Sequence, residues 1–227
     1  MDMNDKSSQN ISQIKVNSDY IRIYHQNVRG LRNKTQELLC HLYPEFPHVI
    51  CLTEHHLNIQ EKSYVNLESY TIGAQFCRTT CVREGVIIYV HDTLKFANID
   101  LTEYCMEKDI EISAARLNIN PLTLCILTIY RAPSGNFAYF LQNLDNVLKT
   151  LYTPSTHLVI CGDLNINYLV ENEQKRHFEN LLLMYNLTGI VDFPTRISHT
   201  SATAIDNFII DISSFEDYSV TPFLNDL

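Results

Sequence analysis

The sequence has no run of eighteen apolar residues, and its start shows no basic segment followed by an apolar one. These absences give no sign of a membrane-spanning helix or of a secretory signal. We therefore expect an intracellular protein without a membrane partner. Internal repeats and low-complexity tracts are missing too, so neither a repeat architecture nor a compositionally biased segment is expected.

A disulfide framework is also missing. The cysteines number seven, which is odd. Cys51, Cys125 and Cys161 stand inside apolar segments, where a cysteine is usually a small buried hydrophobic residue. Free thiols agree with an intracellular location.

Positive charge is scarce. The chain has 17 Lys and Arg against 26 Asp and Glu, for a formal net charge of -9. Affinity for phosphate chains depends on lysine and arginine, so the chain as a whole is not built as a basic surface. A local patch can still be basic. Two clusters are either such patches or ordinary solvated faces: Arg22, Arg29, Arg32 and Lys34, and Arg78 with Arg83.

The length of 227 residues, 45% of them hydrophobic, predicts one domain with a substantial core. Residues 1–18 are polar without apolar periodicity, and we expect a disordered lead-in there. Residues 19–227 are expected to form the single domain.

Short apolar strands alternate with amphipathic helices along the domain. Segments 110–117 and 122–130 are separated by too few residues for a crossover helix, which predicts an antiparallel hairpin. Apolar residues at helical spacing predict helices over 137–151 and from about residue 172. The pattern favours an α/β fold, a four-layer α/β/β/α sandwich of two mixed sheets flanked by helices. A single sheet with helices on both faces is the alternative.

Polar side chains follow several of the predicted strands where each strand ends. The apolar run 158–161 stops at Gly162 and Asp163, with Asn165 close behind. Taken alone, this is also the pattern of a strand entering an ordinary Asx-rich turn. Similar groups end or begin four more strands: Asn27, Glu54, Tyr130 with Arg131, and Asp206. Strand ends gathered at one rim of a sheet would bring them together.

The residue types suit a hard divalent cation. Glu54 and Asn27 offer a carboxylate and a neutral oxygen, ligands that suit Mg²⁺ or Mn²⁺. A zinc site at Glu54, His55 and His56 is the rival. Adjacent residues on a strand point to opposite faces, however, so the two histidines are not expected to share a metal.

The remaining groups suit a phosphate ester. Asp163 can orient or deprotonate a water molecule, with Asn165 fixing the water or the phosphate. Tyr130 and Arg131 can donate hydrogen bonds to phosphate oxygens. The residues therefore predict metal-assisted phosphodiester hydrolysis.

Five segments, in this order, resemble the endonuclease/exonuclease/phosphatase superfamily, and within it the endonuclease domain of non-LTR (LINE-like) retrotransposons. They are QNVRGLRNK from residue 26, LTEH from residue 52, IYRAP from residue 129, GDLNIN from residue 162, and FPTRISHTSATAIDNFI over residues 193–209. The resemblance implies a four-layer α/β sandwich and an apurinic/apyrimidinic-like endonuclease that uses Mg²⁺ or Mn²⁺. It also implies DNA as partner, a reverse transcriptase domain in the same polyprotein, and a nuclear location for action on chromosomal DNA.

Carried over residue by residue, the resemblance assigns Asn27 and Glu54 to the metal. Asp163, Asn165, Tyr130 and Asp206 become the catalytic set. In that set Tyr130 contacts the scissile phosphate, and Asp206 supports a histidine. Glu111 matches an acidic position without a firm role. Substrate contacts are expected from Arg29, Arg131 and Thr195.

One motif of the resemblance is missing. The pattern continues into Ser-Asp-His on a last central strand, and the 227 residues contain no such motif. We therefore expect a sheet without that strand and an incomplete catalytic set, at a cost in rate of about 10²- to 10³-fold per lost group. Two alternatives stay open: a catalytically inactive remnant that keeps metal or DNA binding, and a phosphatase or phosphodiesterase acting on an inositol or lipid phosphate.

Overall fold

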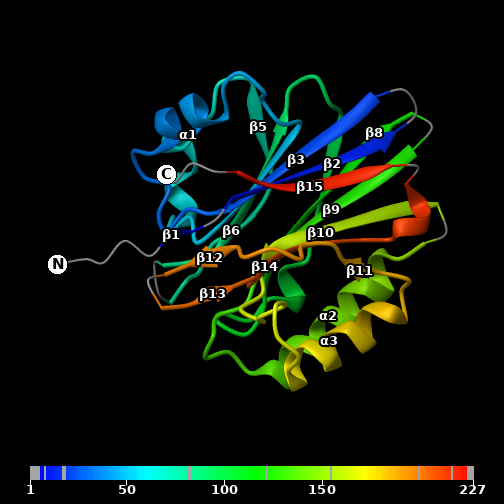
Figure 1. Cartoon of the computed structure of the whole chain (residues 1–227). Helices are drawn as coiled ribbons and strands as arrows, with labels where there is room; N and C mark the ends of the chain where they lie inside the picture. The colour runs from blue at the N-terminus through cyan, green and yellow to red at the C-terminus, as the bar shows by residue number, and fades with distance from the viewer. Residues whose placement is uncertain are drawn as a thin grey trace.

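The chain forms four layers, helix, sheet, sheet and helix, in the computed structural model (Figure 1). The structure describes residues 6–7, 9–16, 19–80, 83–120, 122–153, 155–198, 200–215 and 217–223. Two six-stranded sheets stack in the middle, with α1 outside one and α2 and α3 outside the other. This confirms the sandwich predicted from the sequence.

The first sheet has the strand order β15-β2-β3-β4-β6-β5. Its strands are β2 (Gln9–Val16), β3 (Asp19–Asn27), β4 (Val49–Thr53), β5 (Tyr70–Phe76), β6 (Val86–His91) and β15 (Tyr218–Phe223). Strands β3 and β4 are parallel and are joined through α1 (Thr35–Leu42), whereas the other pairs are antiparallel. The sheet has no gap beside β3, because β2 and then β15 extend it.

The second sheet has the order β11-β14-β10-β9-β8-β7. Its strands are β7 (Phe96–Ile99), β8 (Glu111–Ile119), β9 (Leu122–Tyr130), β10 (Thr156–Asp163), β11 (Thr188–Gly189) and β14 (Asp206–Ile210). The predicted hairpin is confirmed, since β8 pairs antiparallel with β9. Strand β10 returns parallel to β9 through α2 (Phe137–Leu151), and α3 (Glu173–Leu183) follows it.

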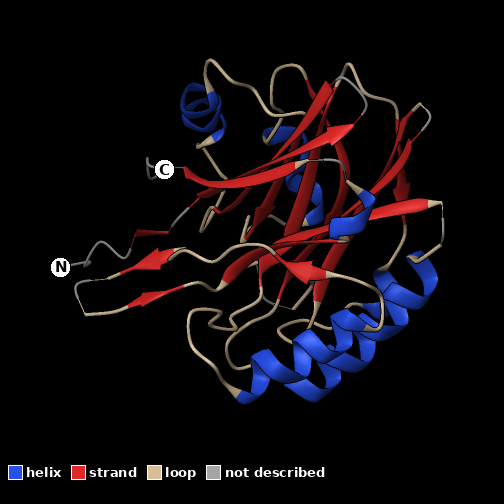
Figure 2. Cartoon of the chain, turned by 45° about the vertical axis from the view of Figure 1, so that its right-hand side comes forward, coloured by secondary structure: helices blue, strands red, loops and turns tan. Residues whose placement is uncertain are grey.

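A small third sheet, β1-β12-β13, lies beside these layers. It contains β1 (Lys6–Ser7), β12 (Arg196–Ile197) and β13 (Ala202–Thr203). The 3-10 helices are η1 (Ile59–Tyr64), η2 (Thr102–Tyr104) and η3 (Ile212–Ser214). In Figure 2 the paired helices α2 and α3 run along the outer face of the strands. No helix in the described part of the chain is long and apolar enough to cross a membrane.

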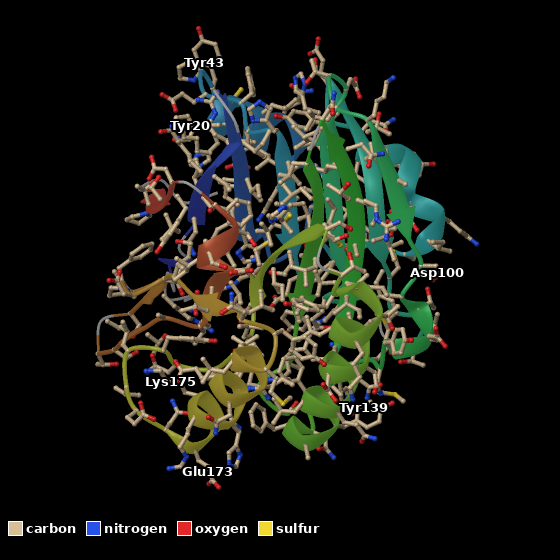
Figure 3. All side chains as sticks on the ribbon, turned by 90° about the vertical axis from the view of Figure 1, so that its right-hand side faces the viewer. Tyr20, Tyr43, Asp100, Tyr139, Glu173 and Lys175 are labelled. Carbon is tan, nitrogen blue, oxygen red and sulfur yellow. The ribbon has the colours of Figure 1, made fainter. Side chains whose placement is uncertain are left out.

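The three largest apolar cores of the described residues hold the layers together. One joins α2 and α3 to the second sheet through residues such as Phe140, Leu144 and Phe178. Another joins α1 to the first sheet through Leu38 and Leu42. The outer face of α3 is polar: Glu173 and Lys175 extend from it at the end of the molecule opposite Tyr20 (Figure 3). The third core fills the space between the two sheets.

The expectation of a disordered lead-in over residues 1–18 is wrong for residues 9–16, which form β2 inside the first sheet. The sequence shows no alternation of apolar and polar residues here, because most of the side chains that β2 turns toward the other sheet are polar. Asn10, Ser12 and Ile14 are buried, and Ile11 packs on the α1 side. Residues 6–7 form β1, while 1–5, 8 and 17–18 lie outside the described residues, as do 224–227 at the other end.

Candidate active site

Five strands bring polar side chains to one rim of the sandwich. Asn27 is the last residue of β3, and Glu54 follows the last residue of β4. Tyr130 ends β9 and lies opposite Asp163 at the end of the parallel strand β10. Asp206 begins the antiparallel strand β14 and lies opposite Asp163 on its other side. The convergence expected from the strand ends is therefore present.

Asn27 makes the hydrogen bonds that connect the side chains of this rim. Its Nδ2 donates to Glu54 Oε1 at 2.8 Å and to Asp163 Oδ2 at 2.9 Å. Its Oδ1 accepts the backbone N–H of Arg29 at 3.2 Å. One carboxamide thus links a carboxylate of the first sheet to a carboxylate of the second.

The loops after β3 and β4 are joined by their backbones. Gly30 N donates to Glu54 O at 2.7 Å, and Leu31 N donates to His55 O at 2.9 Å. Glu54 and His56 have positive φ angles of 54° and 57°. Non-glycine residues are uncommon in this region of φ, and they concentrate at functional sites. The backbone therefore fixes the carboxylate of Glu54 at the rim.

Glu54 is held in its ionised form. Burial raises its pKa, but the nearby His56, the hydrogen bond from Asn27 and the neighbouring Tyr130 outweigh burial, so the pKa lies below its usual value. His56 Nε2 is 3.8 Å from Glu54 Oε2. His55 is buried elsewhere, with Nδ1 accepting from Leu57 N and Nε2 close to Phe76 O. The two histidines do not converge, but strand alternation is not the reason, because residues 54–56 lie beyond the end of β4 and Glu54 and His56 have positive φ.

Asp163 and Asp206 are buried carboxyl groups with raised pKa values. Burial raises the pKa of Asp163 to about 7, and the charge of Glu54 adds to this against the hydrogen bond from Asn27. Burial and the charge of Asp163 raise the pKa of Asp206 well above its usual value. Asp163 is thus poised to exchange a proton near neutral pH.

Gly162 allows β10 to lie close to β9 just before Asp163. A Cβ at this position would lie 1.8 Å from the backbone oxygen of Ile129 on β9. Only glycine permits so close an approach of the two strands. Asn165 follows with φ 50°, and its backbone N–H donates to Asp163 Oδ1 at 3.1 Å. Its side-chain Nδ2 donates to Arg131 O at 2.8 Å, so the carboxamide braces the loop that carries the carboxylate.

Tyr130 is almost fully buried and lies beside Glu54, whose pKa it helps to lower. Burial, together with the charges of Glu54 and Asp163, raises its pKa well above the usual value, so it stays a donor. Glu111 lies opposite Tyr130 across the β8–β9 pair and is fully buried. Its Oε1 accepts from Arg78 Nε at 2.6 Å, and Arg78 also pairs with Glu84. Glu111 therefore belongs to a buried ion network behind the tyrosine.

The expectation that Arg131 meets the substrate is wrong. Its guanidinium donates to Leu164 O and Asn165 O, each at 2.9 Å, and lies over the rings of Phe137 and Phe140. The residue is 1% exposed. Arg131 faces the helix layer because neighbouring residues of an extended chain point to opposite sides, and it holds the loop behind Asp163 in place.

Thr195 is also buried, contrary to the expected substrate contact. Its Oγ1 donates to Asp206 Oδ2 at 2.9 Å and accepts from the backbone N–H groups of Ile205 and Asp206. It orients the aspartate. Arg29 lies exposed at the rim with φ 44°, so a substrate contact stays a prediction for this residue.

Sequence reasoning missed three residues. Arg78 was placed in a basic surface cluster but is 5% exposed and paired with carboxylates. Arg196 was part of a quoted motif without a role, and its charge lowers the pKa of both Asp163 and Asp206. His25 stands two residues before Asn27, and its Nδ1 is 3.9 Å from Asp206 Oδ1. Residues two apart on a strand point to the same face, so the position of His25 two residues before Asn27 was the available signal in the sequence.

The donor set suits a hard cation that keeps most of its water. Among the described residues, no three His, Cys, Asp or Glu side chains form a metal site by themselves. The rim instead offers oxygen from Glu54 and Asp163 around one carboxamide, which fits Mg²⁺ or Mn²⁺ with few protein ligands. Asn27 turns its nitrogen toward both carboxylates. Its role as a ligand therefore requires the carboxamide to rotate, and it stays a prediction.

No family model matches the sequence. The fold is nevertheless shared with solved nuclease and phosphatase structures that superpose on most of the chain.

Among these structures is the endonuclease domain of TRAS1, a telomere-specific non-LTR retrotransposon. Its TM-score is 0.67 at 12% identity, over 84% of each chain. The AP endonuclease LMAP from Leishmania major gives a TM-score of 0.61 at 15% identity, over 84% of this chain and 78% of LMAP. The 3' phosphatase NExo from Neisseria, bound to a product DNA hairpin, gives 0.58 at 13% identity, over 84% and 86%. At identities this low, the structural similarity shows a shared fold and nothing more.

Proposed function

We propose that the chain is a Mg²⁺-dependent (or Mn²⁺-dependent) endonuclease that hydrolyses a phosphodiester bond of DNA. The observation that carries the proposal is the bridge made by Asn27, whose Nδ2 joins Glu54 and Asp163 at 2.8 and 2.9 Å. Asn27 and Asp163 are 136 positions apart. The fold brings them together at a rim where the backbone takes uncommon φ values.

Charge supports a cation at this rim. Glu54, Asp163 and Asp206 lie close enough to influence one another's pKa values. Such a group repels a phosphate unless positive charge is supplied. A divalent cation held by Glu54, with Asn27, would supply that charge and polarise a phosphoryl oxygen.

The remaining roles follow from burial and hydrogen bonding. Asp163 has a pKa of about 7, so its carboxylate can take a proton from an attacking water near neutral pH. Tyr130 stays protonated and can donate to a phosphate oxygen. Asn165, through its backbone N–H and carboxamide, keeps Asp163 in position. Asp206 stands behind this set, oriented by Thr195.

The choice of DNA rests on the fold neighbours and on the quoted motifs. The TRAS1 domain is an endonuclease of a retrotransposon, and NExo was solved with a DNA product. By the same likeness we propose a reverse transcriptase domain of the same polyprotein as partner, and a nuclear location for action on chromosomal DNA.

Nicking of supercoiled plasmid with Mg²⁺ tests the proposal. We expect the wild-type chain to nick, EDTA to stop the reaction, and Glu54→Gln and Asp163→Asn each to lower the rate by at least about 10²-fold. The exposed Glu68→Gln is the matched control and should nick like wild type. Wild-type rates in both site variants would contradict the site assignment.

The alternatives give different results in the same experiment. An inactive remnant would bind Mn²⁺ or DNA in a way that Glu54→Gln weakens, yet would leave the plasmid intact. A phosphatase or phosphodiesterase on an inositol or lipid phosphate would release phosphate or headgroup from those substrates while sparing the plasmid.

A further inference from the structure

A second polar cluster lies behind the carboxylates, between the two sheets. His25 of β3 and Asn10 of β2 are fully buried, and Asp206 of β14 is 4% exposed. His25 Nδ1 lies 3.9 Å from Asp206 Oδ1, and the ring stands edge-on to Phe208 with the centroids 6.4 Å apart. The histidine thus faces the aspartate across the sandwich.

Asn10 joins this cluster through strand pairing. It lies directly opposite His25 in the antiparallel β2–β3 ladder, and opposite residues of such a ladder share a face. Both polar atoms of its carboxamide are buried without a hydrogen-bond partner among the described residues. The same holds for both ring nitrogens of His25 and for Asp206 Oδ1. Buried groups of this kind are costly unless they serve one another or another polar group.

The two oxygens of Asp206 have different neighbours. Oδ2 accepts from Thr195 Oγ1 at 2.9 Å, whereas Oδ1 is the oxygen that faces His25. Thr195 fixes one side of the carboxyl group, so the other side is left to His25. Because Asp206 lies opposite Asp163, any rotation of its carboxyl group changes the surroundings of Asp163.

We propose that His25, backed by Asn10, is the positioning partner of Asp206, and that β2 is therefore a working part of the active site. The proposal rests on the endonuclease function for its effect on rate. His25 is fully buried and cannot touch a substrate, so it acts through Asp206. A neutral imidazole with hydrogen on Nδ1 would present that N–H to Oδ1 and leave Nε2 for the carboxamide of Asn10.

Nitrogen NMR of the imidazole tests the contact without any need for activity. In ¹⁵N-labelled protein we expect His25 to be the Nδ1–H tautomer, and Asp206→Asn to shift its Nδ1 resonance. Asn10→Ala should shift Nε2. Ser12→Ala is the matched control, since Ser12 is equally buried and has no hydrogen-bond partner in the described part of the chain, but lies two residues further along β2. An Nε2–H tautomer, or an Nδ1 resonance that Asp206→Asn leaves in place, would overturn the proposal.

Plasmid nicking then tests the consequence. Asn10→Ala and His25→Asn should each lower kcat by about 10-fold with KM within about twofold of wild type, as for a residue that orients a catalytic group. Ser12→Ala should leave both constants unchanged. Normal kcat in both variants, in a wild-type chain that nicks, would overturn the positioning role. If wild type does not nick, the proposed function has failed, and the NMR result alone decides whether His25 and Asn10 hold Asp206.

Discussion

Asp163 lies directly opposite Asp206 where β10 pairs with β14, so two buried carboxyl groups occupy one face of the sheet. Natural cores rarely keep such a pair unless it serves a function, because each ionised carboxylate raises the cost of ionising the other. The raised pKa values of both groups express this conflict.

The first prediction concerns the pH dependence of stability. The pKa of Asp163 is about 7 in the folded chain against an ordinary 3.8, so the folded state holds a proton that the unfolded state has lost between these values. Stability should therefore fall as pH rises from about 4 to about 7. Thermal melts of wild type and Asp163→Asn should diverge in this window, with wild type losing several degrees. Parallel curves would contradict the raised pKa.

Magnesium should oppose this loss. A cation at the rim favours the ionised carboxylates, so wild-type melts at pH 7 to 8 should rise with Mg²⁺ concentration, as for any ligand that binds only the folded state. Glu54→Gln should show a much smaller rise. An equal rise in both proteins would place the cation elsewhere.

Arg131 should matter for stability more than for substrate binding. Arg131→Met removes the donor for the loop carbonyls of Leu164 and Asn165, and we expect a loss of about 2 to 4 kcal/mol in the free energy of unfolding. Arg29→Met, at an exposed position, should change it by less than about 0.5 kcal/mol and should weaken DNA binding instead. Urea melts and DNA titrations of the two variants separate the roles. A stable Arg131→Met protein with weakened DNA binding would restore the substrate contact predicted from the sequence.

Arg78 and Glu111, the ion pair behind Tyr130, should contribute jointly to the stability of the fold. Arg78→Met leaves Glu111 buried without its cation, and such a loss typically costs about 3 to 5 kcal/mol. Adding Glu111→Leu should recover part of that stability, because no lone charge stays buried. A double-mutant cycle on urea unfolding measures the coupling. Additive losses would show that the two side chains act independently.

Arg196 should affect the pKa of Asp163. Its charge lowers the pKa of Asp163, so Arg196→Gln should raise that pKa further and move the rising limb of the nicking pH profile to higher pH. Arg196→Lys keeps the charge and should keep the profile. Identical profiles for the Gln variant and wild type would exclude this influence.

The sequence predicted the layers and the rim well because both depend on local patterns. Apolar runs marked the strands, and the polar residue after each run marked its end, which identified Asn27, Glu54 and Asp163 before their contacts were known. The position of Arg131 next to Tyr130 did not predict its contacts, because neighbouring residues of an extended chain point to opposite sides and Arg131 lies over Phe137.

Strand β2 could not be predicted for a different reason. Its inward face carries Asn10 and Ser12, because it lines the polar end of the space between the sheets. Without an apolar pattern, this strand has the sequence character of an unstructured tail. Ion pairs such as Arg78 with Glu111 join residues 33 positions apart, and no local pattern shows them.

The pairing of β2 with β15 has a consequence for how the molecule is made. Ile14 is matched with Tyr218, so the first sheet joins segments that are far apart in the sequence. Contacts of such long sequence separation form late and slow folding. While the ribosome is still producing the middle of the chain, the nascent sheet exposes a hydrogen-bonding edge at β2. A chaperone that shields this edge until residues 218–223 emerge would protect the chain from aggregation.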